Sequence, residues 1–328
     1  MAEVIKPNLK NGHIDMPIPE GLDLKAEIAK MKKEKNAVIL AHYYTTDEVQ
    51  EIADYTGDSL GLAQQAAKTQ ADIILFAGVH FMAETAKVLC PNKKVLIPDL
   101  ATSCSLADSI NEKSLAEFKK QYPDHTVISY VNTTAEVKAL TDIVVTSSNA
   151  QKIVSQLPAD EKVIFGPDKN LGNYIKKVTG RENFVVWQGG CHVHDHFDPE
   201  KLRELKTQHP NAVVLAHPEC PETILEQADV IGATSLLLKK SYELDAQEFI
   251  VATEPGIFYE MKKRSPQKTF IPVPNVNGRP LNVCINMKRN TIQKIYLTLK
   301  YEFPEVDIPK ELGEKAQICI NRMMQMSK

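Results

Sequence analysis

AVILAHYYTTDEVQEIADYTGDSL, residues 37–60, decides the fold of this chain because the same pattern returns twice. It reappears from Thr126 as TVISYVNTTAEVKALTDIVVTSSNA and from Ala212 as AVVLAHPECPETILEQADVIGATSL. Aligning Val38, Val127 and Val213 gives offsets of 89 and 86 residues, which also align apolar runs at 74, 163 and 249 and at 95, 184 and 270. Repeats of this length exceed the solenoid range of roughly 20–50 residues, so each copy is interpreted as a small domain.

Each copy alternates short β-branched runs with amphipathic stretches of about ten residues, which is typical of parallel strands joined by crossover helices. The first copy is predicted to have strands at 38–41, near 55, at 73–77 and at 95–97, and helices at 46–53, 59–69 and 81–89. We therefore expect an α/β fold of three αβα units, related by a pseudo-threefold axis, with short parallel sheets around a central cluster site. The expected boundaries are an N-terminal arm and helix (1–36), three units (37–125, 126–211 and 212–287) and closing helices (288–328).

Composition excludes several classes of function. The net charge is −3 and no basic run is longer than Lys262–Arg264, which argues against a nucleic-acid partner. The start of the chain lacks the apolar core of a signal peptide, and no apolar run approaches the 18 residues of a membrane span. We therefore expect a cytoplasmic protein without a membrane partner, whose six cysteines are reduced thiols or metal ligands rather than disulfides.

Three of the six cysteines are candidate metal ligands. Cys104, Cys191 and Cys284 lie 87 and 93 residues apart, each in a loop that follows a predicted strand. Loops at the carboxyl ends of parallel strands are where ligands collect in open sheets. Cys90 and Cys319 fall at apolar helical positions and are predicted to be buried, which is the usual fate of a free cysteine. Cys220 is a rival fourth ligand.

The spacing favours an iron–sulfur cluster over zinc. A structural zinc site usually takes closely paired CxxC ligands, and the sequence contains none. A four-iron cluster accepts thiolates from distant loops, and three protein ligands leave one iron open. Such an iron acts as a Lewis acid on a substrate hydroxyl or carboxylate.

Two further sets of equivalent positions carry polar groups. The first contains His42, Val131 and His217 with their neighbours, which together supply imidazoles, phenols, an amide and a carboxylate for acid/base chemistry. The second contains Ser59, Ser148 and Thr234 at expected helix starts. Hydroxyls there serve either as N-caps or, with the free N–H groups, in binding a small polyanion. The segment HVHDH, residues 192–196, resembles a metal site, but we expect its histidines to line a solvated loop.

The motifs resemble those of the quinolinate synthase family over roughly residues 37–290. The resemblance rests on AHYY, GDSL, FMAETAKVLCPNKKVLIPD, CSLAD, HPEC, TEPGIFYEM and CINMKRNT. It implies three αβα domains around one [4Fe-4S] cluster per chain, with Cys104, Cys191 and Cys284 as its ligands. It also implies condensation of iminoaspartate with dihydroxyacetone phosphate to quinolinate in NAD biosynthesis, with a functional link to L-aspartate oxidase or aspartate dehydrogenase.

The same resemblance implies roles for residues of this chain. Catalytic roles fall on Tyr44, Tyr130, His217 and Glu219, and substrate-binding roles on His42, Ser59, Tyr130, Val131, Asn132, Ser147, His217, Pro218, Glu219 and Thr234. The family motif selects Ser147 where the repeat offsets select Ser148, and we follow the family. A CxxC pair that some members carry beside the third ligand is absent. A different three-cysteine cluster dehydratase and a cluster-based sensor remain as alternatives.

Overall fold

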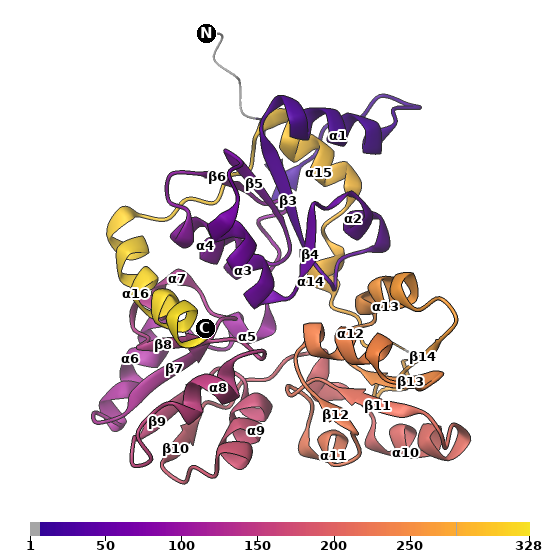
Figure 1. Cartoon of the computed structure of the whole chain (residues 1–328). Helices are drawn as coiled ribbons and strands as arrows, with labels where there is room; N and C mark the ends of the chain where they lie inside the picture. Colours follow the sequence, from indigo (N-terminus) through magenta and orange to yellow (C-terminus); the bar gives the residue numbers. More distant parts are fainter. Residues whose placement is uncertain (1–6, 280) are drawn as a thin grey trace. The chain divides into compact units, whose positions relative to one another are not determined.

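The computed structural model describes residues 7–279 and 281–328, which fall into two compact units (Figure 1). Unit 1 contains the chain up to Cys104 together with Ile285–Glu314, and unit 2 contains Ser105–Cys284 with Lys315–Lys328. The described residues form three parallel sheets of four strands flanked by helices, so the chain has the expected α/β fold. Unit 1 holds one of these sheets and unit 2 holds the other two.

Unit 1 is built around the sheet of the first repeat, in the strand order β4-β3-β5-β6. Its elements are β1 (Leu9–Lys10), β2 (His13–Ile14), α1 (Leu24–Glu34), β3 (Ala37–His42), α2 (Asp47–Ile52), β4 (Tyr55–Gly57), α3 (Ser59–Lys68), β5 (Ile73–Ala77), α4 (His80–Leu89), β6 (Lys94–Leu96), α14 (Ile285–Lys288) and α15 (Ile292–Tyr301). The expected strands and helices of the first repeat are thus confirmed to within two residues at each end. Apolar residues of α1, α15 and the sheet, among them Ile28, Leu75 and Ile295, form one buried cluster.

The first half of unit 2 contains the sheet of the second repeat, in the order β8-β7-β9-β10. Its elements are α5 (Ser105–Asp108), α6 (Glu112–Gln121), β7 (Thr126–Tyr130), α7 (Ala135–Ala139), β8 (Ile143–Val145), α8 (Ala150–Ser155), β9 (Val163–Gly166), α9 (Lys169–Thr179) and β10 (Phe184–Val186). Asp168 caps α9 by accepting a hydrogen bond from the backbone of Leu171, and Gly180 ends the helix with a positive φ of 65°.

The second half of unit 2 repeats the same order with β12-β11-β13-β14. Its elements are η1 (His194–His196), α10 (Pro199–Gln208), β11 (Val213–Ala216), α11 (Glu222–Leu225), β12 (Val230–Ile231), α12 (Thr234–Glu243), β13 (Glu248–Ala252), η2 (Pro255–Ile257), α13 (Phe258–Arg264) and β14 (Thr269–Pro272). Most of α16 (Lys310–Met326) also belongs to unit 2. No helix within the described ranges combines the length and the apolar character needed to cross a membrane.

Strand pairing corrects the register of the repeat. The first strands align at Leu40, Ile128 and Leu215, which pair with Tyr55, Ile143 and Val230, so the first two strands repeat at offsets of 88 and 87. The third and fourth strands keep the expected 89 and 86, as positions 74, 163 and 249 show. The offsets differ because the second repeat has one extra residue between its second and third strands. The offsets expected for the first block were therefore wrong by one residue.

A repeated hydrogen-bond pair supports the corrected register. The carboxylates of Asp54, Asp142 and Asp229 each accept a backbone N–H from the first strand of their repeat, at 2.8–2.9 Å and a separation of 15 residues. Each of these aspartates also donates its own backbone N–H to the same strand residue at 3.0 Å. In this register Ser59, Ser147 and Thr234 are equivalent, as are His42, Tyr130 and His217. Ser148 and Val131 are each one residue beyond the equivalent position.

Candidate active site

Polar side chains follow the first strands of both sheets in unit 2. Tyr130 is the last residue of β7, and His217 and Glu219 lie in the loop after β11. All three are buried, with exposed fractions of 3–4%. The Tyr130 hydroxyl donates to Glu219 Oε1 at 2.5 Å, and His217 Nδ1 lies 3.9 Å from the same oxygen. The second and third repeats therefore bring a phenol, an imidazole and a carboxylate together.

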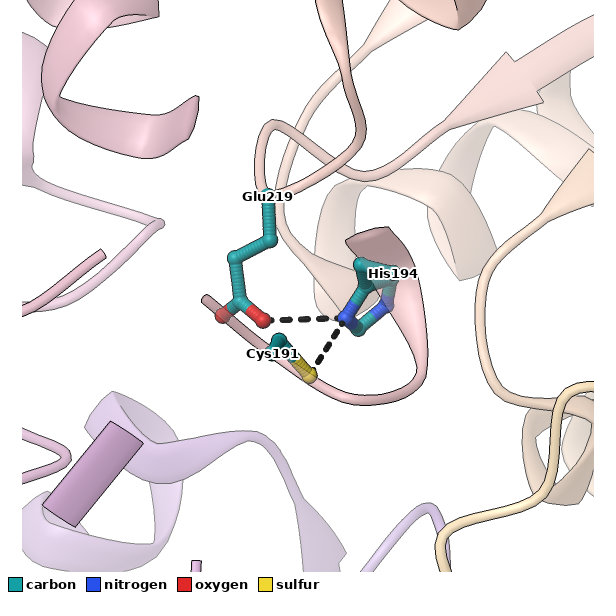
Figure 2. A group of neighbouring side chains, drawn as sticks. All are labelled: Cys191, His194 and Glu219. Carbon is teal, nitrogen blue, oxygen red and sulfur yellow. Dashed lines mark hydrogen bonds and ion pairs between the residues drawn. The ribbon is translucent and has the colours of Figure 1, made fainter. Parts of the chain in front are cut away.

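His194 joins this group, which corrects the expectation of a solvated histidine loop. Its side chain is buried (2% exposed), whereas His196 in the same turn is exposed. Figure 2 shows its Nδ1 between Glu219 Oε2, at 2.9 Å, and Cys191 Sγ, at 3.3 Å. Its Nε2 lies 2.9 Å from Thr253 Oγ1, and its ring stacks on that of His217 with centroids 4.5 Å apart. The prediction failed because the segment 192–196 is polar as a whole, and nothing in it indicates which histidine is buried.

The surroundings shift the pKa values of Glu219 and Tyr130 in opposite directions. Burial alone would raise the pKa of Glu219, but the charges of His217 and His194 and the hydrogen bonds from His194 and Tyr130 hold it well below its usual range. Burial first, and then the Glu219 charge, raise the pKa of Tyr130 well above 10. At neutral pH the site thus combines an ionised carboxylate with a protonated phenol.

A second carboxyl group, that of Asp168, lies close enough to Glu219 to feel its charge. Asp168 is fully buried, and burial together with the Glu219 charge raises its pKa well above the usual range. Its Oδ1 caps α9, while Oδ2 has no hydrogen-bond partner among the described residues. Gly189 packs against the same segment, since a Cβ there would lie 2.5 Å from the Pro167 carbonyl oxygen. A larger side chain at Gly189 would therefore clash with this segment.

Asn170, on the first turn of α9, binds both the turn that carries His194 and the loop that carries Glu219. Its Nδ2 donates to Asp195 Oδ1 and to the Glu219 carbonyl oxygen, both at 2.9 Å. Lys169 Nζ binds the other oxygen of Asp195 at 2.8 Å. The turn that carries His194 and the loop that carries Glu219 are therefore fastened to one helix.

The predicted residues of unit 1 form their own buried cluster after β3. His42 Nδ1 accepts the backbone N–H of Tyr44 at 3.1 Å, and the two rings meet edge to face with centroids 4.5 Å apart. His42 and Tyr44 are both less than 10% exposed. Ser59 begins α3 and is half-buried, but the N-cap is Asp58, whose carboxylate accepts from Gly61 at 2.9 Å.

The other hydroxyls of this set are also not the capping side chains of their helices. The N-cap of α12 is Ala233, one residue before the buried Thr234, and the N-cap of α8 is Asn149, two residues after Ser147. Ser147 hydrogen-bonds to Tyr130 and lines a cavity of about 370 Å³ in unit 2. The same cavity is lined by the exposed Ser148 and by Pro218 and Lys239, among others. Val131 is buried and Asn132 is half-buried in the loop after β7.

The six cysteines divide into two sets of three. Cys90, Cys220 and Cys319 are buried, and each thiol donates to a backbone carbonyl oxygen, of Ala66, Ala252 and Lys138 respectively. Burial raises the pKa of all three thiols, which disfavours the thiolate that binds metals. Cys104 in unit 1 and Cys191 and Cys284 in unit 2 are half-buried. The half-buried set, and the Cys191–His194–Glu219 group with ligand atoms within 4.8 Å of one another, are compatible with a metal cofactor.

Comparison with known proteins identifies the family. Residues 26–325 match the family model described as quinolinate synthetase A protein. The chain is 54% identical over 305 residues to the quinolinate synthase of Microcystis aeruginosa, covering 93% of this chain and 95% of that protein. It is 56% identical over 305 residues to the quinolinate synthase of Synechocystis, covering 93% and 96%. The chain therefore belongs to the quinolinate synthetase A protein family of enzymes.

Proposed function

We propose that this enzyme condenses iminoaspartate with dihydroxyacetone phosphate to give quinolinate, phosphate and two waters, as a step of NAD biosynthesis. The observation that carries the proposal is the buried Tyr130–Glu219–His194 group beside Cys191, in a chain that is 54% identical to a quinolinate synthase. The reaction needs repeated proton transfer, which is the chemistry such a group supplies. Iminoaspartate must be supplied by oxidation of aspartate, which gives the expected link to L-aspartate oxidase or aspartate dehydrogenase.

We assign Cys104, Cys191 and Cys284 as ligands of a [4Fe-4S] cluster. These three half-buried cysteines fit the assignment, because the other three are buried thiols bonded to carbonyl oxygens. The assignment excludes Cys220 as a fourth ligand. A cluster with three protein thiolates supplies an open, Lewis-acidic iron.

The chain's own residues divide the remaining work. Glu219 is assigned to accept protons and Tyr130 to donate them, because a hydrogen bond already joins the phenol to the carboxylate. His217 stacks on His194 and lies near Glu219 Oε1, where it orients the carboxylate. We also assign Tyr44 of unit 1 a catalytic role, because it belongs to the AHYY motif that this chain shares with the family.

Anionic groups of the substrates are assigned to the equivalent hydroxyls. Ser59, Ser147 and Thr234 are equivalent positions at or just before helix starts, where backbone N–H groups favour anions, so we assign their hydroxyls to phosphate or carboxylate. His42, Val131, Asn132 and Pro218 complete the substrate-binding set. The cytoplasmic location and the absence of nucleic-acid and membrane partners remain predictions.

The test combines anaerobic iron and sulfide quantitation with mass-spectrometric assay of quinolinate. Wild-type protein should hold about four iron and four sulfide per chain and form quinolinate only when dihydroxyacetone phosphate is present. Glu219→Gln should lower turnover by about 10²–10⁴-fold while keeping its iron. A protein that dehydrates a hydroxy acid without dihydroxyacetone phosphate, and forms no quinolinate when it is added, would instead be a simple hydroxy-acid dehydratase.

The cysteine sets provide a matched control. Cys104→Ala, Cys191→Ala and Cys284→Ala should each lose the brown colour of the cluster. Cys220→Ala should keep its iron, because its thiol is committed to the Ala252 carbonyl. A colourless Cys220→Ala protein would make that residue a ligand and rule out the open iron.

A further inference from the structure

We propose that His194 is a positioning residue whose Nδ1–H bridges Cys191 and Glu219, coupling the sulfur of a cluster ligand to the catalytic carboxylate. The inference rests on the proposed function for the roles of those two partners. No motif used for the family resemblance contains His194.

The hydrogen of His194 can be placed from its partners. A carboxylate oxygen accepts hydrogen bonds, so the imidazole carries a hydrogen on Nδ1 to bind Glu219 Oε2 at 2.9 Å. The same nitrogen lies 3.3 Å from Cys191 Sγ, within hydrogen-bonding range of sulfur. One N–H thus faces two acceptors in a three-centre arrangement.

The ring is held in this orientation from three directions. Thr253, just after β13, contacts Nε2 at 2.9 Å, and the ring of His217 stacks on one face. The backbone N–H of Asp195 returns to the Cys191 carbonyl at 2.9 Å, which closes the turn between the two ends of the bridge. Asn170 fastens this turn and the Glu219 loop together through Asp195 and the Glu219 carbonyl.

Two consequences follow from this geometry. First, Glu219 has one oxygen on Tyr130 and the other on His194, so His194 fixes the rotation of the carboxylate. Second, a hydrogen bond to a ligating sulfur stabilises the reduced form of a cluster, and outer partners of this kind tune both potential and activity. Loss of the bridge should therefore change both kcat and the reduction potential of the cluster, whereas loss of a purely structural histidine would not change them together.

The experiment compares three substitutions. His194→Asn keeps an N–H donor near the Nδ1 position, His194→Gln moves the donor toward Thr253, and His194→Leu removes it. We expect Leu and Gln to lower kcat by about 10–100-fold with KM changed little, and to make the cluster's reduction potential more negative. Asn should restore most of both. His196→Asn, in the same turn but exposed, should leave both measurements unchanged.

A second measurement separates this inference from the proposed function. In cluster-free wild-type protein labelled with ¹⁵N-histidine, the His194 signal should show a protonated Nδ1. A bare Nδ1, a His194→Leu protein with wild-type potential and kcat, or equal behaviour of the Asn and Gln variants would overturn the bridge. Wild-type protein that shows protonated Nδ1 but holds no iron or makes no quinolinate would overturn the proposed function instead.

Discussion

The loops after β3 and β7 begin with equivalent backbone hydrogen bonds, from Tyr43 to Gly57 and from Val131 to Val145, but different side chains hold them. In the first repeat, Gln50 Nε2 donates to the carbonyl oxygens of Tyr43 and Thr45, at 2.9 and 3.1 Å. In the second, Lys138 Nζ donates to those of Val131, at 2.9 Å, and Thr133. Gln50 and Lys138 are equivalent positions at the 88-residue offset, and both are buried.

The comparison shows that two chemically different donors can hold the same loop at this point. An amide and an ammonium group satisfy the same two carbonyl groups. In the third repeat the equivalent position is the apolar Leu225, which supplies no such side-chain donor to this loop. The loop keeps the backbone hydrogen bond from Cys220 to the His217 carbonyl, at 2.9 Å, that the first repeat has from Thr45 to His42, at 3.0 Å. Because these loops carry residues assigned to substrate binding, their donors are expected to affect both stability and substrate affinity.

The substitution expected to have the largest effect on these loops is Lys138→Met, which removes the donor of the second repeat. It removes this buried donor from the carbonyl oxygens of Val131 and Thr133, and the loss of each hydrogen bond costs roughly 1–3 kcal/mol. The Val131 carbonyl keeps the Thr133 N–H at 2.8 Å, so its share lies at the lower end. We expect the free energy of unfolding, measured in urea, to fall by roughly 2–5 kcal/mol and KM to rise. Unchanged unfolding would show that the loop does not depend on Lys138.

Lys138→Gln sharpens the same test, since the first repeat shows that one amide serves both acceptors. This variant should recover most of the stability that Met loses, measured under identical conditions. If Gln and Met behave alike, the charge of Lys138 matters and the equivalence with Gln50 is wrong.

Gln50→Leu should have a smaller effect than Lys138→Met. Lys288 Nζ also donates to the carbonyl oxygens of Tyr44 and Thr45, at 2.7 and 3.4 Å, so Thr45 keeps a donor and chiefly the Tyr43 carbonyl loses its own. We expect a loss of about 1–2 kcal/mol, read from the midpoint of urea unfolding. A loss as large as that of Lys138→Met would indicate that Lys288 does not compensate.

The smallest effects should come from the aspartates that the repeats share. Asp142→Ala removes the acceptor of the Val127 N–H, at an expected cost of about 0.5–1.5 kcal/mol. Asp142→Asn keeps an acceptor oxygen and serves as the control. Asp54→Ala should cost slightly more, because Asp54 also pairs with Lys32 at 2.7 Å. Calorimetry of the three proteins gives the ranking, and an effect of Asn equal to that of Ala would refute the hydrogen-bond explanation.

Much of the fold could be predicted because its signals are local. Runs such as Ile73–Ala77 are apolar and buried throughout, and Asp23 caps α1 by accepting a hydrogen bond from the Ala26 N–H. The hairpin β1–β2 was missed although Asn11-Gly12 marks it, with φ values of 52° and 89° that suit a tight hairpin turn. The one-residue error in the first block arose because AVIL and TVIS align equally well at either register.

The candidate site was predictable only where one residue type carries its own signal. Cysteines after strands and HPEC in the loop after β11 could be found in the sequence, and Cys90 and Cys319 are buried as expected. His194 and Lys138 could not, because imidazole and ammonium groups usually lie in solvent and their burial depends on partners 25 residues away or on a loop's carbonyls. The sequence alone does not contain those partnerships.

The extra residue of the second repeat shows where the chain tolerates a change in length. First and second strands are 17 positions apart at 38 and 55, 126 and 143, and 213 and 230, whereas the second and third are separated by 19, 20 and 19. Between the strands of one sheet, the segment that varies in length is the one after the second strand, downstream of the Ser59, Ser147 and Thr234 positions. Epitope tags or fluorophore-bearing peptides introduced near the exposed Asp160 would therefore lengthen this segment without displacing Ser147, giving a labelling position away from the chemistry.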